Sequence, residues 1–192
     1  MNLYLVRHTE FNNPKNLFHF RLPMPLSATG RQNAKRIGQW FVKQKLKKLP
    51  IYSSPMVRCV QTAKLIGVQT DSSVTVDDRL IEVGCPNLQG KPKAEKQAWK
   101  IEQDDPSREP KDRVVARMMS VIKEKVSKGK ECVLVSHGEP LTFAYWYLTN
   151  QKFPRYPWDP KNKSLIIQRG EVVKLEFQGK TFKKATKIKI KS

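Results

Sequence analysis

Apolar residues along the chain form two kinds of pattern, short continuous runs and longer stretches with helical spacing. The runs in Asn2–Val6 and Cys132–Ser136 are typical of strands buried on both faces of a parallel sheet. Pro50–Ser54 predicts a third strand. Because these runs alternate with helical stretches, the pattern predicts a three-layer α/β/α sandwich with a mostly parallel central sheet.

The helical stretches supply the outer layers of this predicted domain. Ser27–Leu46 places apolar residues at helical spacing and opens with hydroxyl residues suited to capping. After the third strand, Ser54 is a candidate N-cap and Pro55 a candidate first helical residue. Lys111–Lys128 has one apolar face, and a further helix is predicted to follow the turn at residues 137–140.

The C-terminal part of the chain predicts a hairpin and a basic end. Ser164–Gln168 and Glu171–Phe177 are short apolar runs separated by an Arg-Gly turn, so we expect a two-stranded hairpin there. Residues 180–192 carry six lysines, which suits either a solvated tail or an edge strand protected from aggregation by charge. We therefore expect one domain over residues 1–179, followed by a basic C-terminal tail.

Length and composition are those of one ordinary globular domain. The chain has 192 residues, 39% hydrophobic and 28% charged, and no apolar run approaches the roughly 18 residues that cross a bilayer. Its three cysteines are odd in number and form no C-x-x-C pair, which favours a reducing, cytoplasmic location over a disulfide framework. The net charge of +20 favours anionic partners, such as phosphorylated metabolites, nucleic acid or an acidic membrane face.

Two of the three histidines stand where open α/β sheets bind their ligands. His8 and His137 each follow the C-terminal end of an apolar run. Arg58 falls in the first turn of the helix after Pro55, from which its guanidinium can lean back to the same sheet edge. Each of these residues alone would more often be structural. Together with Arg7 and the positive end of a helix, they predict a pocket for a dianionic phosphate.

At these positions the chain resembles the histidine phosphatase superfamily, which includes the cofactor-dependent phosphoglycerate mutases. The motifs fall in the family's order and cover roughly residues 1 to 140, and Asn162–Ile167 is similar to the family's last core strand. They are LVRHTE at 5–10, PLSATG at 25–30, SSPMVR at 53–58 with QTA at 61–63, LIE at 80–82 and VSHG at 135–138.

The resemblance implies a role for each matching residue. His8 would be the nucleophile that becomes phosphohistidine, while Arg7, Arg58 and His137 would balance the charge on the transferring oxygens. Glu82 would protonate the leaving group, although it could equally be a surface residue or an arginine partner. Counting back from Pro25 places Asn13 on a phosphate-contacting asparagine. No metal or cofactor is implied.

The chain departs from the family at several positions. Thr9 replaces the usual glycine after the Arg-His pair, which would narrow the pocket, and Leu17 and Phe20 stand where many members carry arginine and glycine. Glu139 would either add negative charge to the pocket or cap the next helix. The segment from 83 to 110, with a short helix expected at 94–101, would form a lid smaller than that of the mutases, which favours hydrolysis.

Aromatic residues supply the remaining candidates for the substrate mouth. They are Trp99, Trp146, Tyr147, Tyr156 and Trp158, of which we expect the two in the helix after residue 140 to pack in the core.

Three functions remain open from the sequence. The first is a phosphatase that acts on small phosphate monoesters, as a monomer or homodimer. The second is a phosphoglycerate mutase-type phosphotransferase that uses the same pocket. The third is a basic nucleic-acid-binding module, but no familiar RNA-binding motif is visible, so we do not expect nucleic acid as a partner, nor a membrane.

Overall fold

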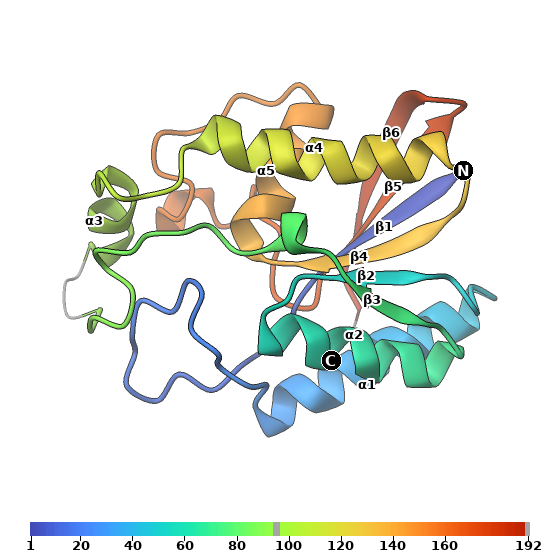
Figure 1. Cartoon of the computed structure of the whole chain (residues 1–192), viewed down its shortest axis with the longest axis horizontal. Helices are drawn as coiled ribbons and strands as arrows, with labels where there is room; N and C mark the ends of the chain where they lie inside the picture. The colour runs from blue at the N-terminus through green and yellow to red at the C-terminus, as the bar shows by residue number, and fades with distance from the viewer. Residues whose placement is uncertain (94–96, 191–192) are drawn as a thin grey trace.

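A computed structural model describes residues 1–93 and 97–190 as a twisted six-stranded sheet between two layers of helices (Figure 1). The strands lie in the order β3-β2-β4-β1-β5-β6. Their bounds are β1 Asn2–Arg7, β2 Ile51–Ser53, β3 Val74–Val76, β4 Cys132–Ser136, β5 Val172–Gln178 and β6 Thr181–Ile188. The predicted three-layer fold with a mostly parallel sheet is confirmed.

The centre of the sheet is the parallel pair β1 and β4. Their register joins Leu3 to Cys132 and Arg7 to Ser136, so both strands end at the same edge. β2 pairs parallel with β4, and β3 with β2, whereas β5 runs antiparallel to β1. The C-terminal ends of four strands and the N-terminal end of β5 therefore meet at one edge.

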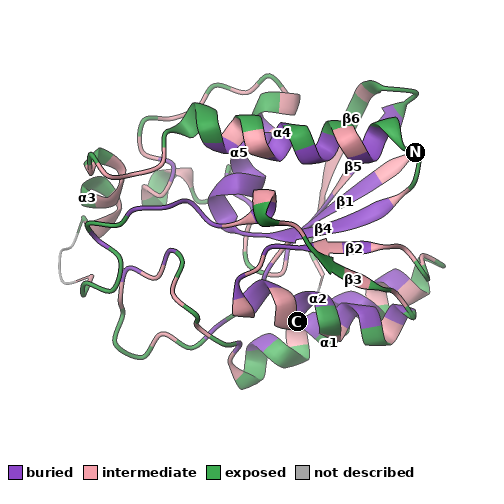
Figure 2. Cartoon of the chain, in the orientation of Figure 1, coloured by how far each residue is buried: buried purple, intermediate pink, exposed green. Residues whose placement is uncertain are grey.

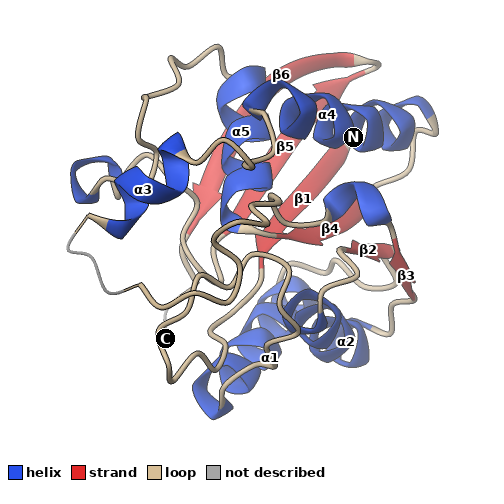
Figure 3. Cartoon of the chain, turned by 60° about the vertical axis from the view of Figure 1, so that its left-hand side comes forward, coloured by secondary structure: helices blue, strands red, loops and turns tan. Residues whose placement is uncertain are grey.

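Two pairs of helices cover the sheet. α1 Ala28–Lys43 and α2 Val57–Thr70 pack on one face, and α4 Lys111–Ser127 and α5 Gly138–Leu148 lie on the other (Figure 3). The buried residues, purple in Figure 2, lie where the helices face the sheet, and they form two large apolar cores. α3 Ala98–Asp104 lies apart, within the lid. No helix in the described ranges is long and apolar enough to cross a membrane.

The C-terminal hairpin differs from the prediction. Ser164–Gln168 is not a strand, nor is the family's last strand found at Asn162–Ile167; instead β5 pairs with β6. Since β1 and β6 already occupy both edges of β5, no pairing position remains for the earlier segment. Residues 181–188 thus form the edge strand of the sheet rather than a tail, and the Lys187 ammonium donates to the carbonyls of Ser164, Leu165 and Ile166.

The predicted start of α2 was also wrong. The helix begins at Val57 with Met56 at its N-cap, and Pro55 lies outside it. The Ser54 hydroxyl accepts a hydrogen bond from the Met56 amide and lies 2.8 Å from Nε2 of His137. Ser54 therefore contacts the residue that follows β4 as well as the start of α2. In the lid, residues 94–96 of the expected helix lie outside the described residues.

Close approach between α1 and the loop after β1 requires a glycine. A Cβ built on Gly30 would lie 1.9 Å from the Glu10 carbonyl oxygen. Because this is a backbone atom, only a shift of the main chain could relieve the clash. The Thr9 hydroxyl also donates to the Gly30 carbonyl. Gly30 thus holds the loop that follows β1 against α1.

We expect Gly30→Ala to lower the free energy of unfolding by about 1–3 kcal/mol, because the added methyl group overpacks this contact. Urea unfolding measures the loss. Gln32→Ala, an exposed position on the same helix, is the matched control and should change stability by less than about 0.5 kcal/mol. Equal stability of Gly30→Ala and the control would contradict this packing.

Candidate active site

His8 lies just after β1 with one ring nitrogen held and the other free. Its amide donates to the Ser136 carbonyl at the end of β4, and the ring Nδ1 lies 2.8 Å from the Thr9 carbonyl oxygen. A carbonyl only accepts, so Nδ1 carries the proton and Nε2 presents its lone pair. Nε2 is buried and has no hydrogen-bond partner among the described residues. The lone pair of this nitrogen is therefore not engaged by any other described residue.

The surroundings of His8 keep its ring neutral. Burial lowers the pKa of His8 well below its usual value of 6.5, and the nearby Arg58 and Arg7 guanidinium groups lower it further. Both effects disfavour the imidazolium form. At neutral pH the ring is therefore neutral, with its proton on Nδ1 and an unprotonated Nε2.

His137 stands beside His8 at the end of β4. The two ring centroids lie 5.2 Å apart, and His137 is fully buried. Its Nε2 lies 2.8 Å from the Ser54 hydroxyl and its Nδ1 3.5 Å from the Glu82 carboxylate. Burial and Arg58 lower the pKa of His137 as well. The second imidazole can therefore hydrogen-bond to an anion without adding a full charge.

Three arginines surround the two imidazoles. One of them, Arg169, was not identified from the sequence. Arg7 donates to the Ile167 carbonyl at 2.7 Å and lies over the Trp158 ring at 5.2 Å. Arg58 is fully buried and donates to the carbonyls of the loop before α1. Arg169, in the turn before β5, is the third member. Nε of Arg7 and Nε of Arg58 are buried without a partner in the described part of the chain.

These arginines are short of countercharge. Burial, with Arg169 adding repulsion, lowers the pKa of Arg7 to about 10. Burial also lowers the pKa values of Arg58 and Arg169. An anion between the guanidinium groups would relieve this repulsion, and paired hydrogen bonds from arginine suit a phosphate.

Gly138 allows this arrangement at the start of α5. A Cβ there would lie 2.5 Å from the Trp158 ring and 2.7 Å from the Arg7 guanidinium carbon. The glycine therefore leaves the room in which Arg7 and Trp158 stack.

Glu82 reaches the site from the segment after the 3-10 turn at Asp78–Leu80. The residue is 7% exposed, and its carboxylate accepts from the Val83 amide at 3.0 Å and lies 3.9 Å from the Arg58 guanidinium. Burial raises the pKa of Glu82 above its usual 4.5, although Arg58 opposes the shift. A carboxyl group in this state is better able to carry a proton at neutral pH.

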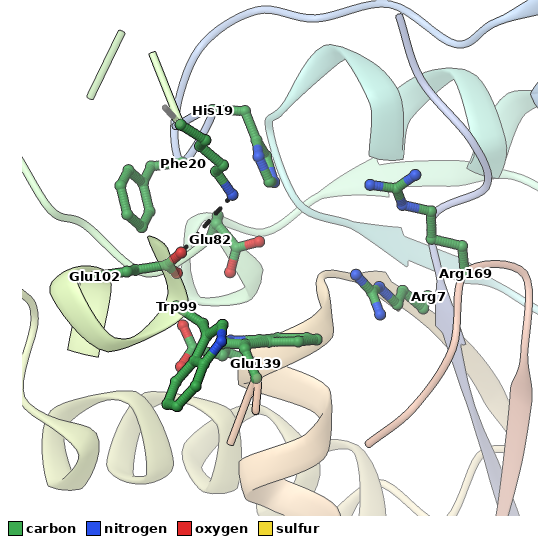
Figure 4. A pocket seen from close by; sticks show the side chains of 10 residues that line it. Arg7, His19, Phe20, Glu82, Trp99, Glu102, Glu139 and Arg169 are labelled. Carbon is green, nitrogen blue, oxygen red and sulfur yellow. Dashed lines mark ion pairs between the residues drawn. The ribbon is translucent and has the colours of Figure 1, made fainter. Parts of the chain in front are cut away.

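The open part of the site is a pocket of about 310 Å³ (Figure 4). Its lining comes from the sheet edge, the loop before α1 and the lid. The lining residues are Arg7, His19, Phe20, Glu82, Lys93, Trp99, Glu102, Glu139, Trp158 and Arg169. No group of three His, Cys, Asp or Glu side chains in the described ranges is arranged to hold a metal ion.

The structure brings together five of the six residues singled out from the sequence. They are Arg7, His8, Arg58, Glu82 and His137. The sixth, Asn13, has no contact with these five among the hydrogen bonds and ion pairs of the described residues; its side-chain amide exchanges two hydrogen bonds of 2.9 Å with the backbone of Leu17. That pair of bonds holds the side chain within its own loop before α1.

The structure shows where two of the departures from the family lie. Thr9 is buried and is not among the residues that line the pocket, and its hydroxyl donates to the Gly30 carbonyl. Glu139 does not cap α5, whose N-cap makes no side-chain bond. It lines the pocket instead and forms a buried ion pair with Arg108.

The aromatic candidates divide between pocket, lid and surface. Trp99 and Trp158 line the pocket, and Tyr156 packs edge-on against Trp99. Trp146 is buried in the core as expected, but Tyr147 is 54% exposed, so the core prediction was wrong for that residue.

Sequence reasoning missed much of the outer pocket. The sequence pattern marks Arg169 only as part of a turn, and the Arg-Gly pair just before a strand is its one local signal. No motif or periodicity marks the others, His19, Lys93, Glu102 and Arg108: Glu102 lies in the short helix α3, and the other three stand in irregular segments. Only their spatial convergence identifies them.

Comparisons with known proteins decide the family. Residues 3–186 match the histidine phosphatase superfamily (branch 1). The chain belongs to this superfamily. Its architecture also superposes on the vanadate (VO3) complex of mycobacterial glucosyl-3-phosphoglycerate phosphatase with a TM-score of 0.76, at 22% identity over 97% of this chain and 96% of that one.

Two curated relatives match part of the chain. A putative phosphoserine phosphatase 2 of Hydrogenobacter thermophilus is 37% identical over 46% of this chain and 43% of its own length. Phosphoglycerate mutase 1 of Saccharomyces cerevisiae is 38% identical over 48% of this chain and 39% of its own length. The matches thus span less than half of either relative, and the relatives include both a phosphatase and a mutase.

The histidine environment yields a direct spectroscopic prediction. Because the pKa values of His8 and His137 lie well below 6.5, both rings should remain neutral at pH 6.5 in the free protein, with His8 protonated at Nδ1. Ring ¹⁵N shifts of histidine-labelled protein report this state. The urea-unfolded chain is the control and should titrate near pH 6.5. A native His8 ring half-protonated at pH 6.5 would contradict the assigned environment.

Proposed function

We propose that this protein is a phosphatase that hydrolyses small phosphate monoesters through a phosphohistidine at His8. The observation that carries the proposal is the buried Nε2 of His8, neutral and unpartnered among the described residues, beside three arginines without matching countercharge. A nitrogen nucleophile and a site for a dianion are the two requirements of this reaction. Family membership and the phosphatase among the relatives support the same conclusion.

The first half-reaction transfers the phosphoryl group to the enzyme. His8 Nε2 attacks phosphorus in line as the bond to the ester oxygen breaks, and the proton stays on Nδ1, which donates it in a hydrogen bond to the Thr9 carbonyl. Arg7, Arg58 and His137 stabilise the charge on the equatorial oxygens. Glu82, whose pKa is raised by burial, donates its proton to the departing alkoxide.

The second half-reaction returns the enzyme to its starting state. A water molecule attacks phosphorus while the Glu82 carboxylate accepts its proton, and the P–N bond breaks to restore neutral His8. Inorganic phosphate then leaves the pocket. If a second alcohol replaced water, the same residues would perform a mutase reaction. Among its described residues the lid contains one short helix of seven residues, α3, and we take this small enclosure as support for hydrolysis.

Replacing the nucleophile tests the mechanism. His8→Ala should lower turnover of a phosphate monoester by about 10³-fold or more, because no other group takes over covalent transfer. Quenched reactions of the wild type with ³²P-labelled substrate should trap an acid-labile phosphoenzyme that the variant lacks. Equal unfolding midpoints for both proteins would show that the variant remains folded.

Two results would contradict parts of this proposal. Turnover by His8→Ala at the wild-type rate would exclude His8 as nucleophile. Phosphoglycerate and its bisphosphate primer, supplied together, distinguish the transferase: isomerised phosphoglycerate without free phosphate would establish a mutase in place of a phosphatase.

Glu82 is tested by the dependence on the leaving group. Glu82→Gln should slow hydrolysis of alkyl phosphates by about 10²–10⁴-fold, because their alkoxide must be protonated as it departs. Hydrolysis of p-nitrophenyl phosphate should fall much less, since p-nitrophenolate leaves without a proton. An equal loss with both substrates would show that Glu82 is not the proton donor.

A further inference from the structure

The pocket carries opposite charges on its two sides. Figure 4 shows the guanidinium groups of Arg7 and Arg169 on one side and the carboxylates of Glu82, Glu102 and Glu139 on the other. The arginine side is where the proposed function places the phosphate. The acidic side faces whatever group the phosphate is attached to.

Glu139 is the least satisfied member of the acidic side. It lies in the first turn of α5, is 3% exposed, and pairs through Oε2 with the Arg108 guanidinium. Its other oxygen, Oε1, is buried and has no hydrogen-bond partner among the described residues. A buried acceptor without a donor is unfavourable in free energy. A ligand that supplies the donor removes this penalty, and its binding is stabilised accordingly.

The cation nearest to Glu139 is shared with a second carboxylate. Arg108 pairs with both Glu139 and Glu102, while Lys93 lies 3.8 Å from Glu102 and Arg58 lies 3.9 Å from Glu82. Burial raises the pKa of Glu139 to about 7 against the effect of Arg108, and Glu102 and Glu82 raise it further. A positive charge placed here would reduce the repulsion among the carboxylates.

Two tryptophans, Trp99 and Trp158, also line the pocket. The Arg7 guanidinium already lies over the Trp158 ring, which leaves Trp99 as the ring for a further cation. Aromatic rings combined with carboxylates are suited to an ammonium group, which is attracted to the ring faces and donates hydrogen bonds to the acids.

We propose that the pocket selects zwitterionic phosphate monoesters of the aminoalkyl type, with the phosphate on the arginine side and the ammonium group donating to Oε1 of Glu139. The assignment of substrate class rests on the proposed phosphatase function. Selectivity in binding does not depend on the chemical step, and it can be measured apart from it.

Non-hydrolysable phosphonates provide that measurement. Calorimetry on the wild type compares 2-aminoethylphosphonate with propylphosphonate, which replaces the ammonium by a methyl group of similar size. We expect the amino ligand to bind at least about tenfold more tightly, the effect of one hydrogen bond to a charged group. Equal affinities overturn the proposal. So does equal or tighter binding of 2-hydroxyethylphosphonate, because Oε1 would then select a hydroxyl group.

Glu139→Gln tests the residue and keeps its shape. The ratio of the two affinities should fall at least fivefold in this variant. Glu176→Gln removes a carboxylate from β5, outside the pocket lining, and should preserve the wild-type ratio. An unchanged ratio in folded Glu139→Gln overturns the assignment to Glu139. If this variant does not fold, the wild-type ligand comparison still decides the proposal.

Turnover then separates the two proposals. If 2-aminoethyl phosphate is hydrolysed with a higher kcat/KM than propyl phosphate, both stand. If neither ester is hydrolysed but the amino phosphonate binds more tightly, the phosphatase function fails and the charge selectivity stands. If both esters are hydrolysed with equal kcat/KM, the selectivity fails alone.

Discussion

The parallel register of β1 against β4 is the constraint on which the site depends. It places Arg7 opposite Ser136, so the residues that follow both strands, His8 and His137, emerge side by side. A shift of one residue would turn one imidazole toward the opposite face of the sheet. The register is set by apolar residues buried on both faces, and the core thereby determines the separation of the two rings.

Burial gives the same residues their chemistry. Removing His8 and the arginines from water lowers their pKa values together, so the imidazole stays neutral while the guanidinium groups repel one another. The native structure tolerates this repulsion through a few backbone acceptors, such as the Ile167 carbonyl at Arg7. A functional site that is electrostatically unfavourable when empty has a large driving force for binding a dianion.

The central strands and the inner site were predictable because their signals are local. An apolar run followed by His8 or His137 specifies a strand end, and parallel strands bring such ends to one edge. Arg169 escaped prediction because β5 is antiparallel to β1, which brings the beginning of that strand to the edge. β5 forms its hairpin with β6, which follows it in the chain, and not with Ser164–Gln168, which precedes it. The apolar run at Ser164–Gln168 did not indicate which of the two segments would pair. The outer pocket depends on lid contacts, for which the sequence has no periodic signal.

The hydrogen bonds of Arg58 to the carbonyls of Phe20 and Leu22 have a consequence for the order of events at the site. They fix the guanidinium in place before any ligand arrives, so its conformational entropy is already lost in the apoprotein. Phe20 itself holds a positive φ of 23°, a conformation unusual for an aromatic residue. Arg58 is therefore oriented when the chain folds rather than when a ligand binds, and the loop before α1 and this guanidinium become ordered together.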